Sequence, residues 1–128
     1  MNSETDILYN KEQQLTLDLY WPTQNADSKP ANSVDQQAAL AIETPAKNNI
    51  ASQNTKGTIL LLHGGGWFRG DKQKEAFLAE KFTAQGYLVA APNYRLAPAA
   101  IYPAAMTDVL AAFDWLKASG RLPKERPI

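Results

Sequence analysis

The middle of the chain reads Thr58-Ile59-Leu60-Leu61-Leu62-His63-Gly64-Gly65-Gly66-Trp67. Residues 58–62 form an apolar run without polar alternation, which predicts a central strand buried on both faces of a parallel sheet. The three glycines that follow let the backbone adopt positive φ angles and bring its N–H groups close to a ligand. This stretch therefore predicts a buried strand that ends in a ligand-binding glycine turn.

The residues after the turn predict an alternation of helices and strands. Asp71 can cap a helix whose apolar residues recur at helical spacing over 76–83. A second buried strand is expected at 87–91, and a second amphipathic helix between Pro103 and Gly120. Strand, helix, strand and helix joined by short connections are typical of a right-handed parallel α/β sheet.

The residues before the turn divide into an ordered segment and a polar segment. Residues 15–20 alternate apolar and polar side chains, which predicts a half-buried strand, with residues 7–9 as its hairpin partner. From 23 to 57 the sequence is rich in Asn, Gln, Ser and Ala and has no aromatic residue, so we expect a flexible insertion with a possible short helix at 34–42. Residues 1–128 are thus expected to form one partial domain with an insertion at 23–57.

The composition excludes several classes of protein. The chain has 128 residues, 45% of them hydrophobic, which fits one small globular domain. Its 13 basic and 13 acidic residues balance, so neither a nucleic-acid nor an anionic-membrane partner is expected. One histidine and no cysteine cannot build the usual three-ligand zinc site, and we expect no metal and no cofactor. Without a signal peptide or a run of about 18 apolar residues, the protein is expected to be cytoplasmic and not to enter a membrane.

Three kinds of site use a glycine turn after a buried strand. A phosphate-binding loop aligned on Gly65 requires a lysine where Asp71 stands, and a dinucleotide fingerprint aligned on Gly64 requires a glycine where Arg69 stands. The third kind is an oxyanion hole, whose backbone N–H groups stabilise the charge on a tetrahedral acyl intermediate. Esterases and lipases build it from an HGGG motif, and one such donor contributes about 3 to 4 kcal/mol. The sequence favours this third kind of site.

Further motifs extend the pattern along most of the chain. They are Leu15–Pro22, His63–Trp67, Gly70-Asp71-Lys72, Asn93–Pro98, Tyr102-Pro103-Ala104 and Asp108. In these motifs the sequence resembles α/β-hydrolases, in particular the hormone-sensitive-lipase-like carboxylesterases and the feruloyl-esterase-like (BD-FAE-like) hydrolases. The resemblance implies an α/β fold, the N-terminal part of an α/β-hydrolase sheet. Antiparallel leading strands would precede a parallel strand-helix-strand-helix unit, and the sheet would end before the nucleophile elbow.

The same resemblance implies roles for the residues of the glycine turn. The N–H groups of Gly65 and Gly66 would form the oxyanion hole, while His63 would support the loop. Trp67 would line the pocket for the acyl group. The substrate implied is a small-molecule carboxylic ester.

Other polar and aromatic residues have structural interpretations. The resemblance suggests that Arg95 and Asp108 form a buried ion pair below the active site, but either residue could equally be a solvated surface charge. Tyr94 and Trp115 are expected to be core aromatics. Asp71 is expected to be a helix cap.

The sequence does not contain the catalytic residues that an oxyanion hole serves. This class of hydrolase needs a serine in a G-x-S-x-G elbow, followed by an acid and a histidine. None of the serines has this context: Ser3, Ser28, Ser33, Ser52 and Ser119. The single histidine, His63, belongs to the glycine turn, so it is not free to act as the general base.

Two hypotheses about function remain. In the first, the chain is the N-terminal fragment of a serine hydrolase acting on carboxylic esters and is inactive alone. The elbow is then expected after a further strand that begins near residue 126. In the second, the chain is a stand-alone, non-catalytic remnant or interaction module of the α/β-hydrolase fold. An open apolar edge beside the strand at 87–91 argues against the second hypothesis.

Overall fold

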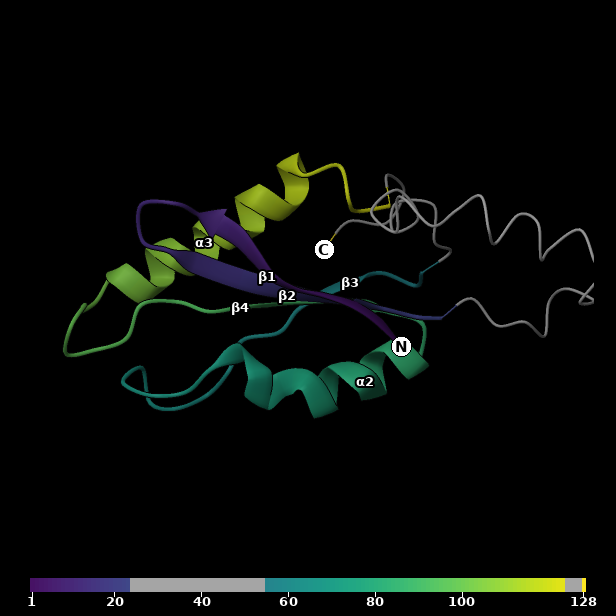
Figure 1. The fold of residues 1–128 in the computed structure, drawn as a ribbon, viewed down its shortest axis with the longest axis horizontal. Coiled ribbons are helices and arrows are strands. Elements are labelled where there is room, and N and C mark those ends of the chain that lie inside the picture. Colours follow the sequence, from purple (N-terminus) through teal and green to yellow (C-terminus); the bar gives the residue numbers. More distant parts are fainter. Residues whose placement is uncertain (24–54, 124–127) are drawn as a thin grey trace, which may run out of the picture.

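A computed structural model describes residues 1–23, 55–123 and 128 of the chain. These residues form a four-stranded sheet between two α-helices, with α2 on one face and α3 on the other (Figure 1). The strands are β1 (Asn2–Asn10), β2 (Leu15–Trp21), β3 (Thr58–Leu60) and β4 (Leu88–Pro92). The helices are the 3-10 helix η3 (Lys72–Glu75) and the α-helices α2 (Ala76–Ala84) and α3 (Ala104–Ala118). None of these helices is long and apolar enough to cross a membrane.

The sheet has the strand order β1-β2-β4-β3. β1 pairs antiparallel with β2, β2 pairs antiparallel with β4, and β3 runs parallel to β4. The expected antiparallel leading strands, the parallel pair and the connecting helix are therefore confirmed. The short helix expected at 34–42 and the further strand expected near 126 lie outside the described residues.

Most of the insertion expected at 23–57 also lies outside the described residues, but its last three residues belong to the fold. The Lys56 N–H donates to the Gly86 carbonyl at 2.8 Å, and the Gly57 carbonyl accepts from the Leu88 N–H at 3.0 Å. These bonds continue the pairing of β3 with β4 toward the start of both strands. Thr55 is buried beside them.

Two expectations about the sheet differ from the structure. β4, not β3, is the central strand: all its residues are buried, and it lies between β2 and β3. The expectation of an open edge beside residues 87–91 is therefore wrong, because β2 pairs antiparallel with β4 along that side. Among the described strands β3 is an edge strand, as is β1 at the other side, and Leu62 beyond β3 is exposed.

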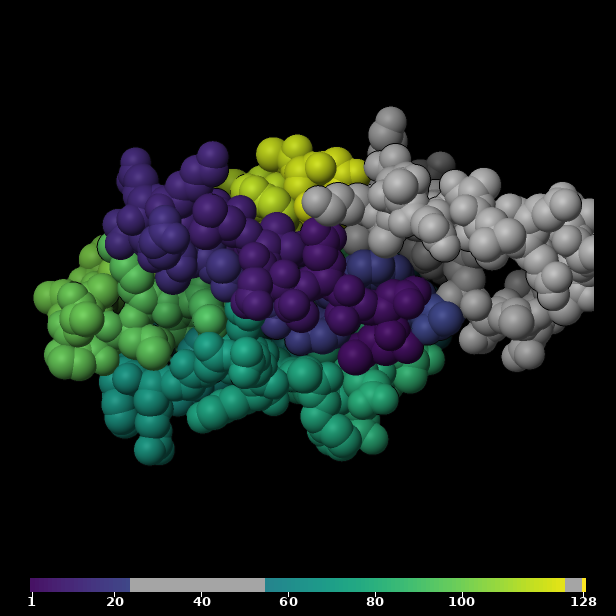
Figure 2. All heavy atoms as spheres, in the orientation of Figure 1, coloured from purple at the N-terminus to yellow at the C-terminus, as the bar shows by residue number. Residues whose placement is uncertain are grey.

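β2 was expected to be half-buried, and this expectation was wrong too, because six of its seven residues are buried. Helices cover both faces of the sheet, so the polar positions of β2 are covered as well as the apolar ones. Its outer neighbour β1 is mostly exposed and crosses one side of the molecule between the end of α3 and the residues of α2 (Figure 2).

The sheet forms a hydrophobic core on each face. The core below α3 is formed by buried residues of β1, β2, β4 and α3: Tyr9, Leu15, Leu17, Leu19, Trp21, Leu88, Ala90, Ala112 and Leu116. Trp115 packs against this core, as expected for a core aromatic. The smaller core below α2 contains Tyr20, Ala79, Val89 and Ala91. Both cores hold β4 in the centre, so the residues that follow β3 and β4 project from a rigid base.

Candidate active site

The glycine turn begins at His63, shortly after β3 ends at Leu60, and it lies on the same side of the sheet as the loop after β4, because parallel strands end at the same edge (Figure 1). Gly65 and Gly66 have φ angles of 138° and 65°, and Trp67 has a φ of 70°. The Gly65 carbonyl accepts from the N–H groups of Phe68 and Arg69 at 3.4 and 3.3 Å. A Cβ atom on Gly65 would lie 1.8 Å from the Arg69 carbonyl oxygen, so the turn requires glycine at this position.

The N–H groups of Gly65 and Gly66 are free to bind a ligand in the described part of the chain. No described residue accepts a hydrogen bond from either of them. At the neighbouring Gly64, a Cβ atom would meet no other atom within 4 Å, so Gly64 borders open space. Backbone donors without a partner can stabilise an anionic oxygen.

His63 is buried at the start of the turn and is held by Tyr94. The two rings stack with centroids 4.3 Å apart and planes 5° from parallel. The Tyr94 hydroxyl donates to the His63 carbonyl oxygen at 2.5 Å, and the His63 Nδ1 lies 3.0 Å from the Gly64 carbonyl oxygen. Burial, followed by the charge of Glu75, raises the pKa of Tyr94, so this hydroxyl remains a donor at neutral pH. Tyr94 is thus a buried aromatic, as expected, that also fixes the first residue of the turn.

The other end of the turn approaches its start closely. A Cβ atom on Gly70 would lie 2.3 Å from the Gly64 carbonyl oxygen and 2.4 Å from the His63 Nδ1. Gly70 also has a φ of 116°. Only glycine at this position allows the loop to close over the histidine ring.

Asp71 caps η3, as expected. Its Oδ1 accepts from the Gln73 N–H at 2.8 Å, and its Oδ2 accepts from the Asn93 side-chain amide at 3.0 Å. The bond from the Gln73 N–H is the main cause of the lowered pKa of Asp71. The carboxylate is therefore ionised when it caps the helix.

Arg95 and Asp108 form the ion pair that the resemblance suggested, with Asp108 buried and the Arg95 side chain 31% exposed. Asp108 is buried in the first turns of α3, where its carboxylate accepts from the Arg95 backbone N–H at 2.9 Å. The guanidinium Nε donates to the same carboxylate at 2.9 Å and Nη2 at 3.0 Å. These bonds raise the pKa of Arg95 and attach the loop after β4 to α3.

Sequence reasoning missed a buried charged cluster below the turn. Lys72 lies with its Nζ atom 2.8 Å from the carboxylates of both Asp18 and Asp6. The period-two alternation of β2 had placed Asp18 on a solvent-facing side, whereas α2 and η3 cover that side. The Gly70-Asp71-Lys72 motif was the one signal that pointed to this residue, and by itself it gave no partner.

A cavity of about 350 Å³ lies beside the glycine turn. It is formed by the turn, the loop after β4 and the start of α3: Trp67, Arg95, Ala97, Ala100, Ile101, Tyr102, Ala105 and Met106. The surface of its wall is almost entirely apolar. The Ala97 N–H donates to the Trp67 carbonyl at 2.9 Å and joins the two loops. Trp67 and Arg95, predicted for separate roles, thus line the same cavity.

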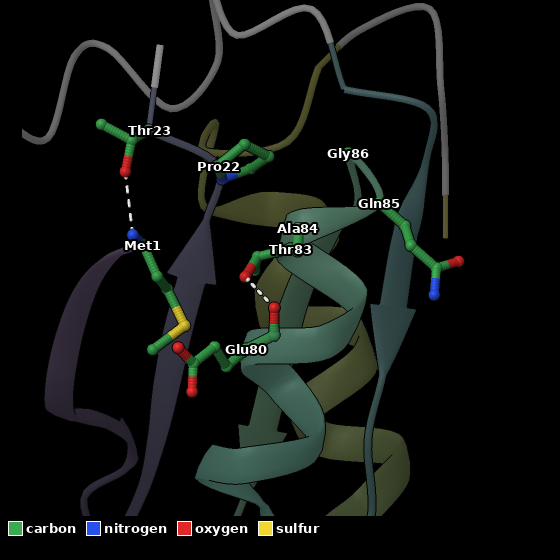
Figure 3. Close-up of a pocket in the computed structure, with 8 residues that line it drawn as sticks. All are labelled: Met1, Pro22, Thr23, Glu80, Thr83, Ala84, Gln85 and Gly86. Carbon is green, nitrogen blue, oxygen red and sulfur yellow. Dashed lines mark hydrogen bonds between the residues drawn. The ribbon is translucent and has the colours of Figure 1, made fainter. Parts of the chain in front are cut away.

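A second cavity, of about 370 Å³, lies at the opposite end of the sheet (Figure 3). It is formed by the start of β1, the end of β2 and the end of α2: Met1, Pro22, Thr23, Glu80, Thr83, Ala84, Gln85 and Gly86. Two hydrogen bonds join residues drawn there, since the Met1 amine donates to Thr23 Oγ1 and Thr83 Oγ1 donates to the Glu80 carbonyl. None of the residues predicted for the site lines this cavity, so the cavity beside the glycine turn is the better candidate for a reaction site.

Comparisons with known proteins show what the chain is similar to. A family model described as BD-FAE matches residues 40–121. Lipase 2 of Moraxella sp. is 34% identical over 71 residues, which are 55% of this chain and 16% of the lipase. The putative acetyl-hydrolase LipR of Mycobacterium tuberculosis is 35% identical over 71 residues, or 55% of this chain and 23% of that protein.

Among solved structures, esterase B of Lactobacillus rhamnosis superposes with a TM-score of 0.64 at 28% identity. The superposition covers 99% of this chain and 33% of the esterase. The chain therefore spans about a third or less of the length of these relatives.

Proposed function

Since this chain belongs to the BD-FAE family of esterase-like α/β-hydrolases, we propose that residues 1–128 supply the oxyanion hole of a serine hydrolase that acts on carboxylic esters. One observation carries the proposal: the N–H groups of Gly65 and Gly66 have no acceptor among the described residues and are fixed at the end of β3. When a nucleophile attacks an ester, the carbonyl oxygen becomes negatively charged. Two donors that are already in place stabilise this charge without reorganisation.

The neighbouring residues support this role. His63, stacked on Tyr94, would hold the start of the turn, and Trp67 would form part of the wall against which the apolar group of the ester lies. The ion pair of Arg95 and Asp108 would keep the opposite wall attached to α3. The substrate proposed is a small-molecule ester with an apolar acyl or alcohol group, because the wall of the cavity offers few polar atoms.

The nucleophile and the base are proposed to come from residues outside this sequence. The 128 residues contain no G-x-S-x-G motif, and the single histidine has its ring stacked on Tyr94. The chain covers 33% of esterase B, so two thirds of a hydrolase of that length lie beyond the matched region. Residues 1–128 alone would therefore bind the oxyanion of a reaction that they cannot start.

The 128-residue chain is expected not to hydrolyse a short-chain aryl ester above the rate in buffer. The reason is that both the attacking serine and the general base are lacking. Release of the chromogenic alcohol is followed by absorbance, with esterase B as a positive control. Turnover that persists in Gly65→Pro and His63→Ala variants would show that another region of the chain performs the chemistry, contrary to the oxyanion proposal.

A stand-alone interaction module is the second candidate function, and the surface of α3 argues against it. Met106 and Leu110, four residues apart on one side of this helix, are 45% and 59% exposed. β3 also lacks a second neighbour among the described strands. We propose that further polypeptide of the hydrolase covers both surfaces, because an unpaired strand edge and an exposed apolar helix stripe each promote association.

The isolated chain is consequently expected to self-associate, and a Met106→Glu/Leu110→Glu variant is expected to self-associate less. Sedimentation velocity at several concentrations measures the association of both proteins. Glu80→Gln, at an exposed position on α2, is the control and should associate like the wild type. A monomeric wild-type chain that melts cooperatively would favour the stand-alone module instead.

A further inference from the structure

The buried ammonium group of Lys72 joins the end of the glycine turn to two strands. Its Nζ atom lies 2.8 Å from Asp18 Oδ1 on β2 and 2.8 Å from Asp6 Oδ1 on β1. The side chains of Lys72 and Asp18 are 3% and 2% exposed. The Asp6 N–H also donates to Asp18 Oδ1 at 2.8 Å, and the Tyr20 hydroxyl donates to Asp18 Oδ2 at 3.3 Å. The buried carboxylate therefore has partners at both oxygens.

The backbone of Lys72 is bound to the end of β4. Its N–H donates to Asn93 Oδ1 at 2.8 Å, while the Asn93 side-chain amide donates to Asp71 Oδ2 at 3.0 Å. Asn93 itself is fixed to β2, since its N–H donates to the Thr16 carbonyl at 2.9 Å. The residue that ends the turn is thus attached to β1, β2 and the end of β4.

The start of the turn, His63, is attached to Tyr94, the residue that follows Asn93. Tyr94 stacks on His63 and donates to its carbonyl oxygen. Two consecutive residues after the central strand therefore hold the two ends of the turn. Between these ends, Gly65 and Gly66 have little freedom to change their φ angles.

Stability alone does not account for a lysine in this position. Removing an ammonium group from water is costly, and replacing a buried ion pair by apolar side chains is often neutral or stabilising. A buried pair that joins three elements is better explained by the single arrangement that it enforces. The bonds of Lys72 enforce the position at which the turn rejoins the sheet.

We infer that Lys72 is a positioning residue for the glycine turn, and that its ammonium group, held by Asp18 and Asp6, keeps Gly65 and Gly66 in the conformation in which no described residue accepts from their N–H groups. The contacts of Lys72 support its role in holding the turn. That this role affects catalysis rests on the proposed function.

Hydrogen exchange measured by mass spectrometry on the 128-residue chain tests the role of Lys72 in holding the turn. Lys72→Met keeps the aliphatic stem and removes the charge. Exchange in the segment 63–75 is expected to become about tenfold faster or more, because its amides lose the attachment to the strands. Exchange in α3 is expected to change much less than in 63–75, and Lys72→Arg, which keeps the charge, to restore most of the protection.

Lys74→Met is the matched control, because Lys74 lies in the same 3-10 helix and is exposed. It is expected to leave exchange in 63–75 unchanged. Equal exchange in the Lys72→Met variant and the wild type would overturn the inference. If Lys72→Met fails to fold, Asp6→Asn decides, because Asp6 is 70% exposed and its replacement leaves the core intact. Because Asp18 still holds the ammonium group, a smaller effect is expected in Asp6→Asn: exchange about two- to fivefold faster and confined to 63–75 supports the inference, and unchanged exchange overturns it.

A kinetic measurement separates this inference from the proposed function. In a complete hydrolase that contains these residues, Lys72→Met is expected to lower kcat about tenfold with KM nearly unchanged, because oxyanion donors act in the transition state. Faster exchange with an unchanged kcat would contradict the oxyanion role and leave the positioning intact. Unchanged exchange would contradict the positioning, whatever the hydrolase does.

Discussion

Replacing Gly65 by alanine is expected to lower the kcat of the complete hydrolase by about 10² to 10³, the loss that follows removal of one oxyanion donor. The new Cβ atom would lie 1.8 Å from the Arg69 carbonyl oxygen and 3.2 Å from the Arg69 Cγ. The backbone at Gly65 also has a φ of 138°, which an L side chain rarely adopts. The turn must therefore change shape, and the Gly65 N–H then leaves the position in which it meets the oxyanion.

The same substitution is expected to destabilise the turn in the isolated chain. We expect the free energy of unfolding to fall by about 2 to 4 kcal/mol, from backbone strain and steric overlap together. Urea denaturation measures this change in the Met106→Glu/Leu110→Glu background, where self-association is reduced.

Gly64→Ala is the matched control for Gly65→Ala. A Cβ atom on Gly64 meets nothing within 4 Å, and the residue lies outside the positive-φ region. The free energy of unfolding should therefore change by less than about 1 kcal/mol. Equal losses at Gly64 and Gly65 would mean that the shape of the turn does not depend on the close approach of Arg69.

Replacing Asp18 by asparagine is expected to destabilise the chain by about 3 kcal/mol or more, whereas Asp6→Asn should cost less than about 1 kcal/mol. Both carboxylates lie 2.8 Å from the same ammonium group, so distance does not distinguish them. Their exposure does: Asp18 is 2% exposed and Asp6 is 70% exposed. Asparagine at 18 leaves the Lys72 charge buried beside a neutral group, while water around residue 6 replaces most of the lost attraction.

The comparison is made by urea denaturation at pH 7, where Lys72 is charged. Burial alone would lower the pKa of Lys72, but its bonds to Asp18 and Asp6 outweigh burial and raise it. Asp114→Asn, at an exposed position on α3, is the control and should leave the free energy of unfolding unchanged. Similar losses for Asp6→Asn and Asp18→Asn would show that burial does not set the strength of this pair.

The sequence by itself determined the local features of the protein. The apolar run before the glycines predicted β3, the apolar spacing after Asp71 and Pro103 predicted α2 and α3, and the glycine turn predicted the candidate site. Each of these depends on residues within a few positions of one another. Helix spacing, caps and positive φ angles are properties of short segments, so they can be inferred without knowing the partners of the segment.

The tertiary structure alone decided the order of the strands and the partners of the buried charges. β4 is central because β2, which lies far earlier in the chain, pairs with it, and nothing in either strand specifies that pairing. Lys72 meets Asp18 and Asp6 for the same reason, since those residues lie on strands that η3 reaches only after the sheet has formed. The glycine turn could be read from its residues. The attachments that hold its shape depend on contacts between distant segments, which sequence periodicity does not encode.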